Sequence, residues 1–175
     1  MALTVSQSTH GAVVSGNTLA ATFGGNTTTG HTIVVVANGF NSGAALTVSS
    51  IAISAGAATF TGGKQIAQVG TTTYPSSEGW VAANITGGTT PKITVTFSGA
   101  PQFGDVFIYE LAGMPTTITA DGTAAGVAGT SATACASPSI TTTGTNTIVF
   151  SAFGPSQSMS SGEATWTAQV GSGGA

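Results

Sequence analysis

Apolar and polar residues alternate with a period of two along much of the chain, and the spacing typical of an amphipathic helix is nearly absent. In residues 92–97 every second position is Ile, Val or Phe, and the positions between them are Lys or Thr. Such alternation predicts a strand with one buried face. The pattern recurs in residues 163–170, where Ala164, Trp166 and Ala168 share one face of the predicted strand.

Denser apolar runs predict strands that are covered on both faces. Residues 33–37 are continuously apolar, which is typical of a central strand. Residues 105–111 and 147–153 are nearly as apolar and predict two further strong strands. Because only a short connection joins residues 92–97 to residues 105–111, we expect these two strands to be antiparallel neighbours.

Clusters of Gly, Asn, Ser and Pro separate the strand-like segments at intervals of about 10 to 15 residues, as in sandwiches and barrels. Residues 74–79 contain one Pro, two Ser and one Gly and predict a loop. Residues 112–140 are rich in small residues and predict either an extended edge segment or a long surface loop. No convincing linker divides the chain, so we expect residues 1–175 to form a single all-β domain, an antiparallel β-sandwich.

The unusual feature of the composition is its lack of charge. Only 4% of the residues are Asp, Glu, Lys or Arg, and Arg is absent, whereas about a quarter is typical of globular domains. The surface must therefore consist of Thr, Ser, Asn and Gly, so that copies repel one another weakly. This favours a protein packed against copies of itself or a larger assembly. The alternative is an extracellular-type domain with a Thr- and Ser-rich exterior.

The same composition excludes several classes of partner. With a net charge of −3 and no cationic stripe, the chain is not expected to bind nucleic acid or anionic membranes. No apolar stretch approaches the roughly 20 residues of a membrane-spanning helix. The N-terminus lacks the basic and apolar regions of a secretory signal. We therefore expect either a virion protein made in the host cytoplasm or a domain excised from a longer protein.

The few titratable residues do not form a recognisable catalytic or metal-binding pattern. Asp105 and Glu110 lie on one predicted strand at opposite parity, so their side chains are expected on opposite faces. His10 and His31 have no partner at ligand spacing and are interpreted as polar residues at strand edges. The single Cys135 excludes an internal disulfide. We expect no enzymatic activity, no metal and no cofactor.

One group of residues could bind a sugar. Tyr74 and Trp80 could form an exposed aromatic pair, with Glu78 as the acid that contacts the ligand. The alternative is that the aromatic rings belong to the core and that Glu78 is a solvated loop carboxylate.

Residues 80–98, with segments 109–113, 129–133 and 139–150, resemble a group of Gly- and Thr-rich β-sandwich domains in phage virion proteins and bacterial surface proteins. The resemblance covers about two thirds of the chain and lies in its general Gly- and Thr-rich pattern rather than in a diagnostic motif. It implies jelly-roll-like packing and a structural or adhesive role, and it transfers no catalytic residue. A phage capsid decoration (cement) protein is similar in size and fold class.

We therefore expect a non-catalytic structural virion protein, such as a capsid decoration or fibre-type subunit. It would form a homo-oligomer and bind other structural proteins of a particle. The alternative is a carbohydrate-binding or adhesive module of a bacterial surface protein, located outside the cell or on its surface, with a glycan as ligand.

Overall fold

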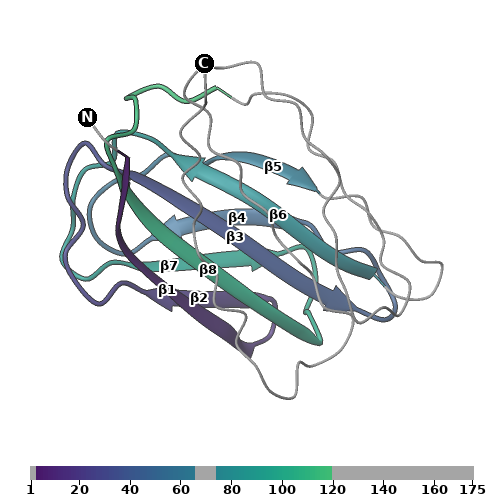
Figure 1. Ribbon diagram of the computed structural model, residues 1–175. Helices are drawn as coiled ribbons and strands as arrows, with labels where there is room; N and C mark the ends of the chain where they lie inside the picture. Colours follow the sequence, from purple (N-terminus) through teal and green to yellow (C-terminus); the bar gives the residue numbers. More distant parts are fainter. Residues whose placement is uncertain (1–2, 66–73, 120–175) are drawn as a thin grey trace.

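The computed structural model describes residues 3–65 and 74–119, which form eight strands and no helix (Figure 1). The strands are β1 (Thr4–Ser15), β2 (Thr18–Thr22), β3 (Thr32–Asn41), β4 (Val48–Ile53), β5 (Thr61–Gln65), β6 (Tyr74–Ala82), β7 (Lys92–Phe97) and β8 (Phe103–Ala112). No helix in these ranges is long and apolar enough to cross a membrane.

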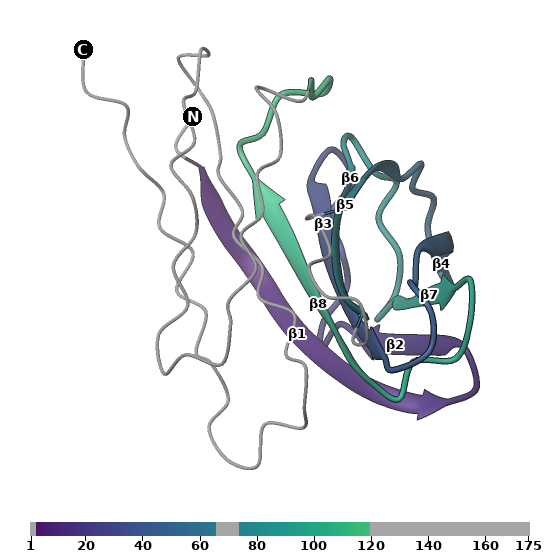
Figure 2. The ribbon, with the colours of Figure 1, turned by 90° about the vertical axis from the view of Figure 1, so that its right-hand side faces the viewer.

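The strands form two antiparallel sheets that share β1. Five strands pair in the order β1-β8-β3-β6-β5, and three pair in the order β2-β7-β4. The last residues of β1 leave the first sheet and pair with β2 of the second. Figure 2 shows the three-stranded sheet on one side of the five-stranded sheet. The predicted all-β, sandwich-like fold is confirmed, and the jelly-roll arrangement stays a prediction.

Period-two patterning explains where the core lies. The alternating positions Ile93, Val95 and Phe97 of β7 are buried, as predicted, while Lys92 is exposed. They pack between the sheets against the inward positions of β2, β3, β4, β6 and β8. Strand β3 lies between β8 and β6, and its first nine residues are buried on both faces, which confirms the prediction of a central strand.

Two predictions about the strands are wrong. Residues 74–79, expected to form a loop, are the first part of β6. Polar side chains are tolerated in this strand because they form hydrogen bonds there. The buried Ser77 Oγ donates to Asn38 Oδ1 of β3 at 2.7 Å. Pro75 is the second residue of the strand, where a missing N–H costs the ladder little.

Strands β7 and β8 are also not neighbours. β7 pairs with β2 and β4, whereas β8 pairs with β1 and β3. The short connection between them crosses from one sheet to the other instead of closing a hairpin. Its backbone N–H groups are held by other strands and their flanking loops, since Ser98 N donates to Thr47 O and Gln102 N to Phe40 O, each at 2.8 Å.

Several predicted features lie outside the described residues. These are the strands expected at 147–153 and 163–170, most of the small-residue segment 112–140, and Cys135 and Trp166.

Candidate interaction surface

Glu78, one of the three predicted sugar-contacting residues, is a buried strand residue rather than a solvated loop carboxylate. It lies on the inward face of β6 and is 2% exposed. Its Oε1 accepts a hydrogen bond from Val48 N of β4 at 2.8 Å, and its Oε2 accepts one from Trp80 Nε1 at 3.1 Å. The carboxylate therefore ties the five-stranded sheet to the three-stranded sheet.

Trp80 and Tyr74 belong to the same strand. Trp80 is partly buried and packs against the core, and its indole N–H points to Glu78. The backbone of Tyr74 pairs with Asn41, while its side chain lies outside what the structure describes. Glu78 and Trp80 are therefore in contact, but both point inward. A sugar platform needs rings exposed on one surface.

Glu110 is a second buried carboxylate, and its role was missed by the sequence analysis. It is 1% exposed and points inward from β8. Its Oε1 accepts hydrogen bonds from Thr28 N at 2.7 Å and from His31 Nδ1 at 2.8 Å, and its Oε2 accepts one from Gln7 Nε2 at 2.6 Å. This cluster joins β8, β1 and the loop between β2 and β3. His31, interpreted from the sequence as a polar residue at a strand edge, lies directly before β3 and has Glu110 as its partner.

The parity of β8 is as predicted. Glu110 faces the core, and Asp105 lies on the opposite, outer face of the five-stranded sheet, which is the face turned away from the three-stranded sheet. His10 lies on that outer face too, beside Phe107, with 5.8 Å between the ring centroids. At His10, β1 pairs with β8 alone and forms an edge of the five-stranded sheet, as the interpretation of His10 predicts. No group of three or more possible metal ligands occurs among the described residues.

With Glu78 and Glu110 buried, the described surface carries very little charge. Lys92 is exposed and Asp105 is half-buried. Asp121 and Glu163 lie outside the described residues, and so does the side chain of Lys64. The lack of charge that the composition predicted for the surface is therefore more pronounced in the structure, because two of the seven charged residues are held in the interior.

The outer face of the three-stranded sheet shows this lack of charge most clearly. We call it the threonine face. It consists of Thr18, Ala20, Thr22, Ser50, Ala52, Lys92, Thr94 and Thr96, which alternate with the core residues of β2, β4 and β7. All eight are exposed or half-exposed. β4 forms one border of this face and pairs only with β7 among the described strands. The threonine face is the candidate interaction surface.

Asp105 makes the stability of the protein depend on pH. Burial raises the pKa of its carboxyl above the ordinary value, and the charge of His10 opposes this rise. A raised pKa means that the folded state holds the proton more tightly, so the contribution to stability is present at acid pH and is lost as pH rises through the raised pKa. We therefore expect Asp105→Asn to gain stability relative to the wild type as pH rises.

Urea unfolding of both proteins at about pH 3 and about pH 7, on either side of the titration, measures this difference. An Asp105→Asn variant that loses stability relative to the wild type on going from the lower to the higher pH would contradict the assignment. Tyr109, whose pKa burial also raises, titrates well above this range and does not interfere.

No family model, curated protein sequence or solved structure matches this chain.

Proposed function

We propose that the chain is a non-catalytic structural subunit of a virion, such as a capsid decoration or fibre-type protein, that packs with copies of itself on a larger particle. The neutrality of the threonine face carries this proposal. Burying a charged surface in an interface requires its charges to be desolvated and paired. Here the face presents Thr, Ser and Ala with a single Lys92, so contact with a neighbour costs little desolvation of charge.

The edge of the same sheet supports the proposal. Natural edge strands are usually protected from pairing by charges, Pro or bulges. β4 contains neither a charged residue nor Pro, and Ser50 and Ala52 on it are exposed. It has one irregularity, between Val48 and Ser50, near its start. The part of β4 after this irregularity, residues 50–53, is suited to backbone pairing with a neighbouring subunit.

The buried carboxylates also fit a structural role. Each oxygen of Glu78 and Glu110 accepts at least one hydrogen bond from the protein itself. The alternative of a glycan-binding module required Glu78 to face a ligand together with Tyr74 and Trp80. The burial of Glu78 and its hydrogen bond from Trp80 count against that site.

The test is the native mass measured by light scattering across a dilution series. We expect a closed oligomer that dissociates to the monomer only at the lowest concentrations of the series. Ala52→Glu combined with Thr94→Glu places like charges on the threonine face and should weaken association more than tenfold, because juxtaposed like charges cost several kcal/mol. Thr59→Glu, at an exposed position outside this face, is the matched control and should leave the mass unchanged.

Equal urea midpoints for the double variant and its control would show that the new charges act on association rather than on folding. A wild-type monomer at every concentration, or an oligomer that tolerates Ala52→Glu with Thr94→Glu, would overturn the proposed packing surface.

A further inference from the structure

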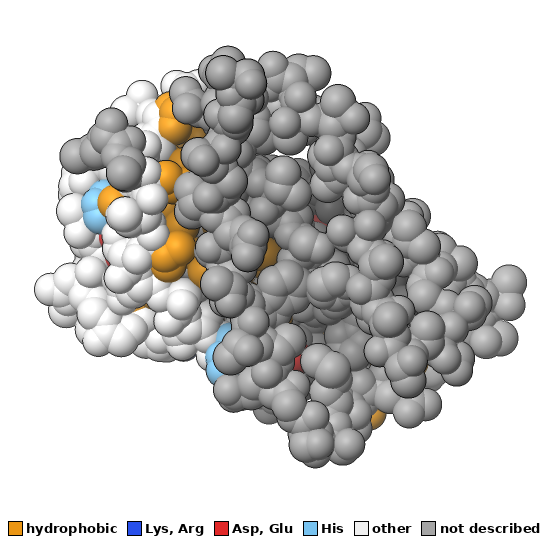
Figure 3. Space-filling view, viewed as in Figure 1, with side chains coloured by type: hydrophobic (Ala, Val, Ile, Leu, Met, Phe, Trp, Pro, Cys, Tyr) orange, Lys and Arg blue, Asp and Glu red, His pale blue; other side chains and the backbone are white. Residues whose placement is uncertain are grey.

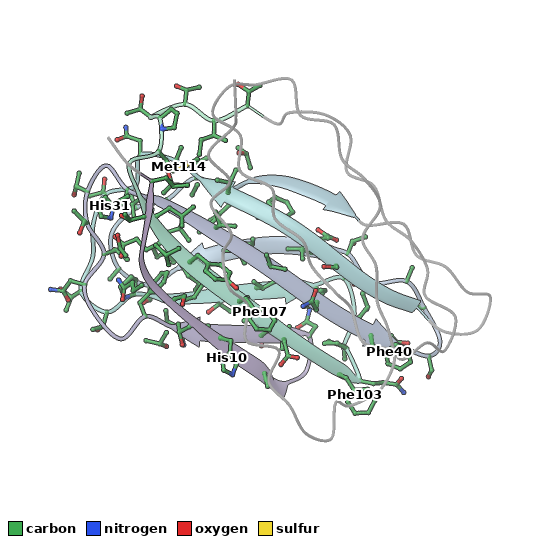
Figure 4. The ribbon with its side chains drawn as sticks, in the orientation of Figure 1. His10, His31, Phe40, Phe103, Phe107 and Met114 are labelled. Atoms are coloured by element: carbon green, nitrogen blue, oxygen red, sulfur yellow. The ribbon has the colours of Figure 1, made fainter. Side chains whose placement is uncertain are left out.

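The outer face of the five-stranded sheet differs in character from the threonine face. Seven large apolar or aromatic side chains on β3 and β8 define it, and we call it the aromatic face: Val34, Val36, Phe40, Phe103, Phe107, Tyr109 and Leu111. Figure 4 shows Phe40 beside Phe103 at one end of the sheet and His10 beside Phe107 near its middle. The first pair is stacked, with 6.0 Å between the ring centroids. In Figure 3 a band of hydrophobic side chains is visible on this side of the molecule.

Burial across the aromatic face is uneven. Val34 and Val36, at the centre, are each 5% exposed, and Phe40 and Leu111, near the strand ends, are 7% and 3% exposed. Phe103, at the end of β8, is 42% exposed, and Val5, which lies on the same side of β1, is 39% exposed. Neighbours within a sheet cover the flanks of a side chain but leave its end open unless another layer lies over the sheet. The burial of the two valines in a single chain therefore calls for a third layer.

We infer that this third layer is the chain's own segment 147–170, which packs on the aromatic face. Of the other parts of the chain outside the described ranges, residues 1–2, 66–73 and 171–175 are too short to cover it, and residues 120–146 are mostly Ala, Gly, Thr and Ser, with few large apolar side chains. The segment follows β8, and the chain turns after Ala112 at Gly113, where φ is 83°. In Figure 1 the chain leaves the five-stranded sheet at this turn, where β8 ends.

The sequence of the segment suits this role. Residues 147–153 and 163–170 are the two strand patterns not used by the described sheets. A strand of seven or eight residues spans about 25 Å at 3.3 Å per residue, which covers most of the length of β3. On the second pattern Ala164, Trp166 and Ala168 provide one apolar face, and Thr165, Thr167 and Gln169 provide a polar one. A second copy of the chain is the competing occupant.

Hydrogen exchange of the unmodified full chain, followed by mass spectrometry, tests the inference. At concentrations where light scattering finds a monomer, we expect the amides of residues 147–153 and 163–170 to be protected from exchange. Exchange at the rate of an unstructured peptide overturns the inference. Protection that appears only when the chain associates overturns it too, because a second copy would then be the occupant.

Substitutions on the face test which surface the segment covers. Val36→Thr buries a hydroxyl under the segment and should speed exchange in residues 147–153 and 163–170 about tenfold, since an unsatisfied buried hydroxyl is costly. Val5→Thr, at the exposed rim of the same face, is the matched control and should leave their exchange unchanged. An equal effect of the two variants, or no effect of Val36→Thr, contradicts the assignment.

Trp166 gives an independent readout, because the chain has only one other tryptophan, Trp80. In full-length Trp80→Phe, monomeric by light scattering, Trp166 should emit at short wavelength and resist quenching by acrylamide. Emission and quenching equal to those of free tryptophan would overturn the packing of the segment. Failure of this inference leaves the threonine face untouched, since the two surfaces lie on different sheets.

Discussion

Replacing Glu110 by alanine is expected to lower the free energy of unfolding by about 3–5 kcal/mol, the range for removing one partner of a buried charged cluster. Three donors lose their acceptor at once, namely Thr28 N, His31 Nδ1 and Gln7 Nε2. Gln7 Nε2 keeps its longer hydrogen bond to Asn26 O at 3.2 Å, in the loop between β2 and β3. Since a domain of this kind has only about 5–15 kcal/mol of stability, the variant is close to unfolding.

Urea unfolding followed by circular dichroism measures the effect, and the same strand provides the control. Asp105→Ala removes a half-buried carboxylate from the opposite face of β8, where burial already disfavours its charge. It should change stability by less than about 1 kcal/mol, as substitutions away from buried networks usually do. If Glu110→Ala proves as mild as Asp105→Ala, the Glu110 cluster does not hold β8, β1 and the loop between β2 and β3 together.

The sequence predicts the positions of the strands more reliably than their pairing. Period-two patterning identifies β7 and its buried face because the polarity of each residue depends on whether its own side chain is buried. The continuous apolar run in β3 identifies a central strand for the same reason. The pairing of β7 with β8 was predicted wrongly, because a short connection can close a hairpin or cross between sheets, and local sequence does not distinguish these. Whether the connection closes a hairpin or crosses between the sheets depends on which distant strands accept hydrogen bonds from its backbone N–H groups.

The same limit explains why the buried carboxylates were misjudged. Glu78 follows Pro and Ser residues and reads locally as part of a loop, yet β6 is held by its long ladder to β3. Glu110 had one local signal, its inward parity on an apolar strand, which identifies burial but not the partners. Gln7 lies 103 residues away in sequence. Partners at such distances become visible only when the sheet order is known.

Gly11→Ala is expected to destabilise the protein by about 3 kcal/mol or more, at or beyond the upper end of the usual cost of overpacking. A Cβ atom on Gly11 would lie 1.9 Å from the carbonyl oxygen of Ala20 and 2.8 Å from its carbonyl carbon. Both atoms belong to the backbone of β2, so no side-chain rotation relieves the contact. The glycine lies where β1 approaches β2 before the two strands pair, and the added methyl group would push them apart.

Thermal unfolding provides the measurement, with Gly79→Ala as the matched control. Gly79 is also a strand glycine, but a Cβ atom there would have no atom within 4 Å, and its φ is not positive. Alanine at this position should leave stability unchanged or raise it by about 0.5–1 kcal/mol, because it restricts the unfolded chain. For Gly11→Ala the expected loss corresponds to a midpoint about 6–12 °C lower in a chain of this length. Equal midpoints for the two variants would mean that β1 and β2 are not in contact at Gly11, and the passage of β1 from one sheet to the other would need a different path.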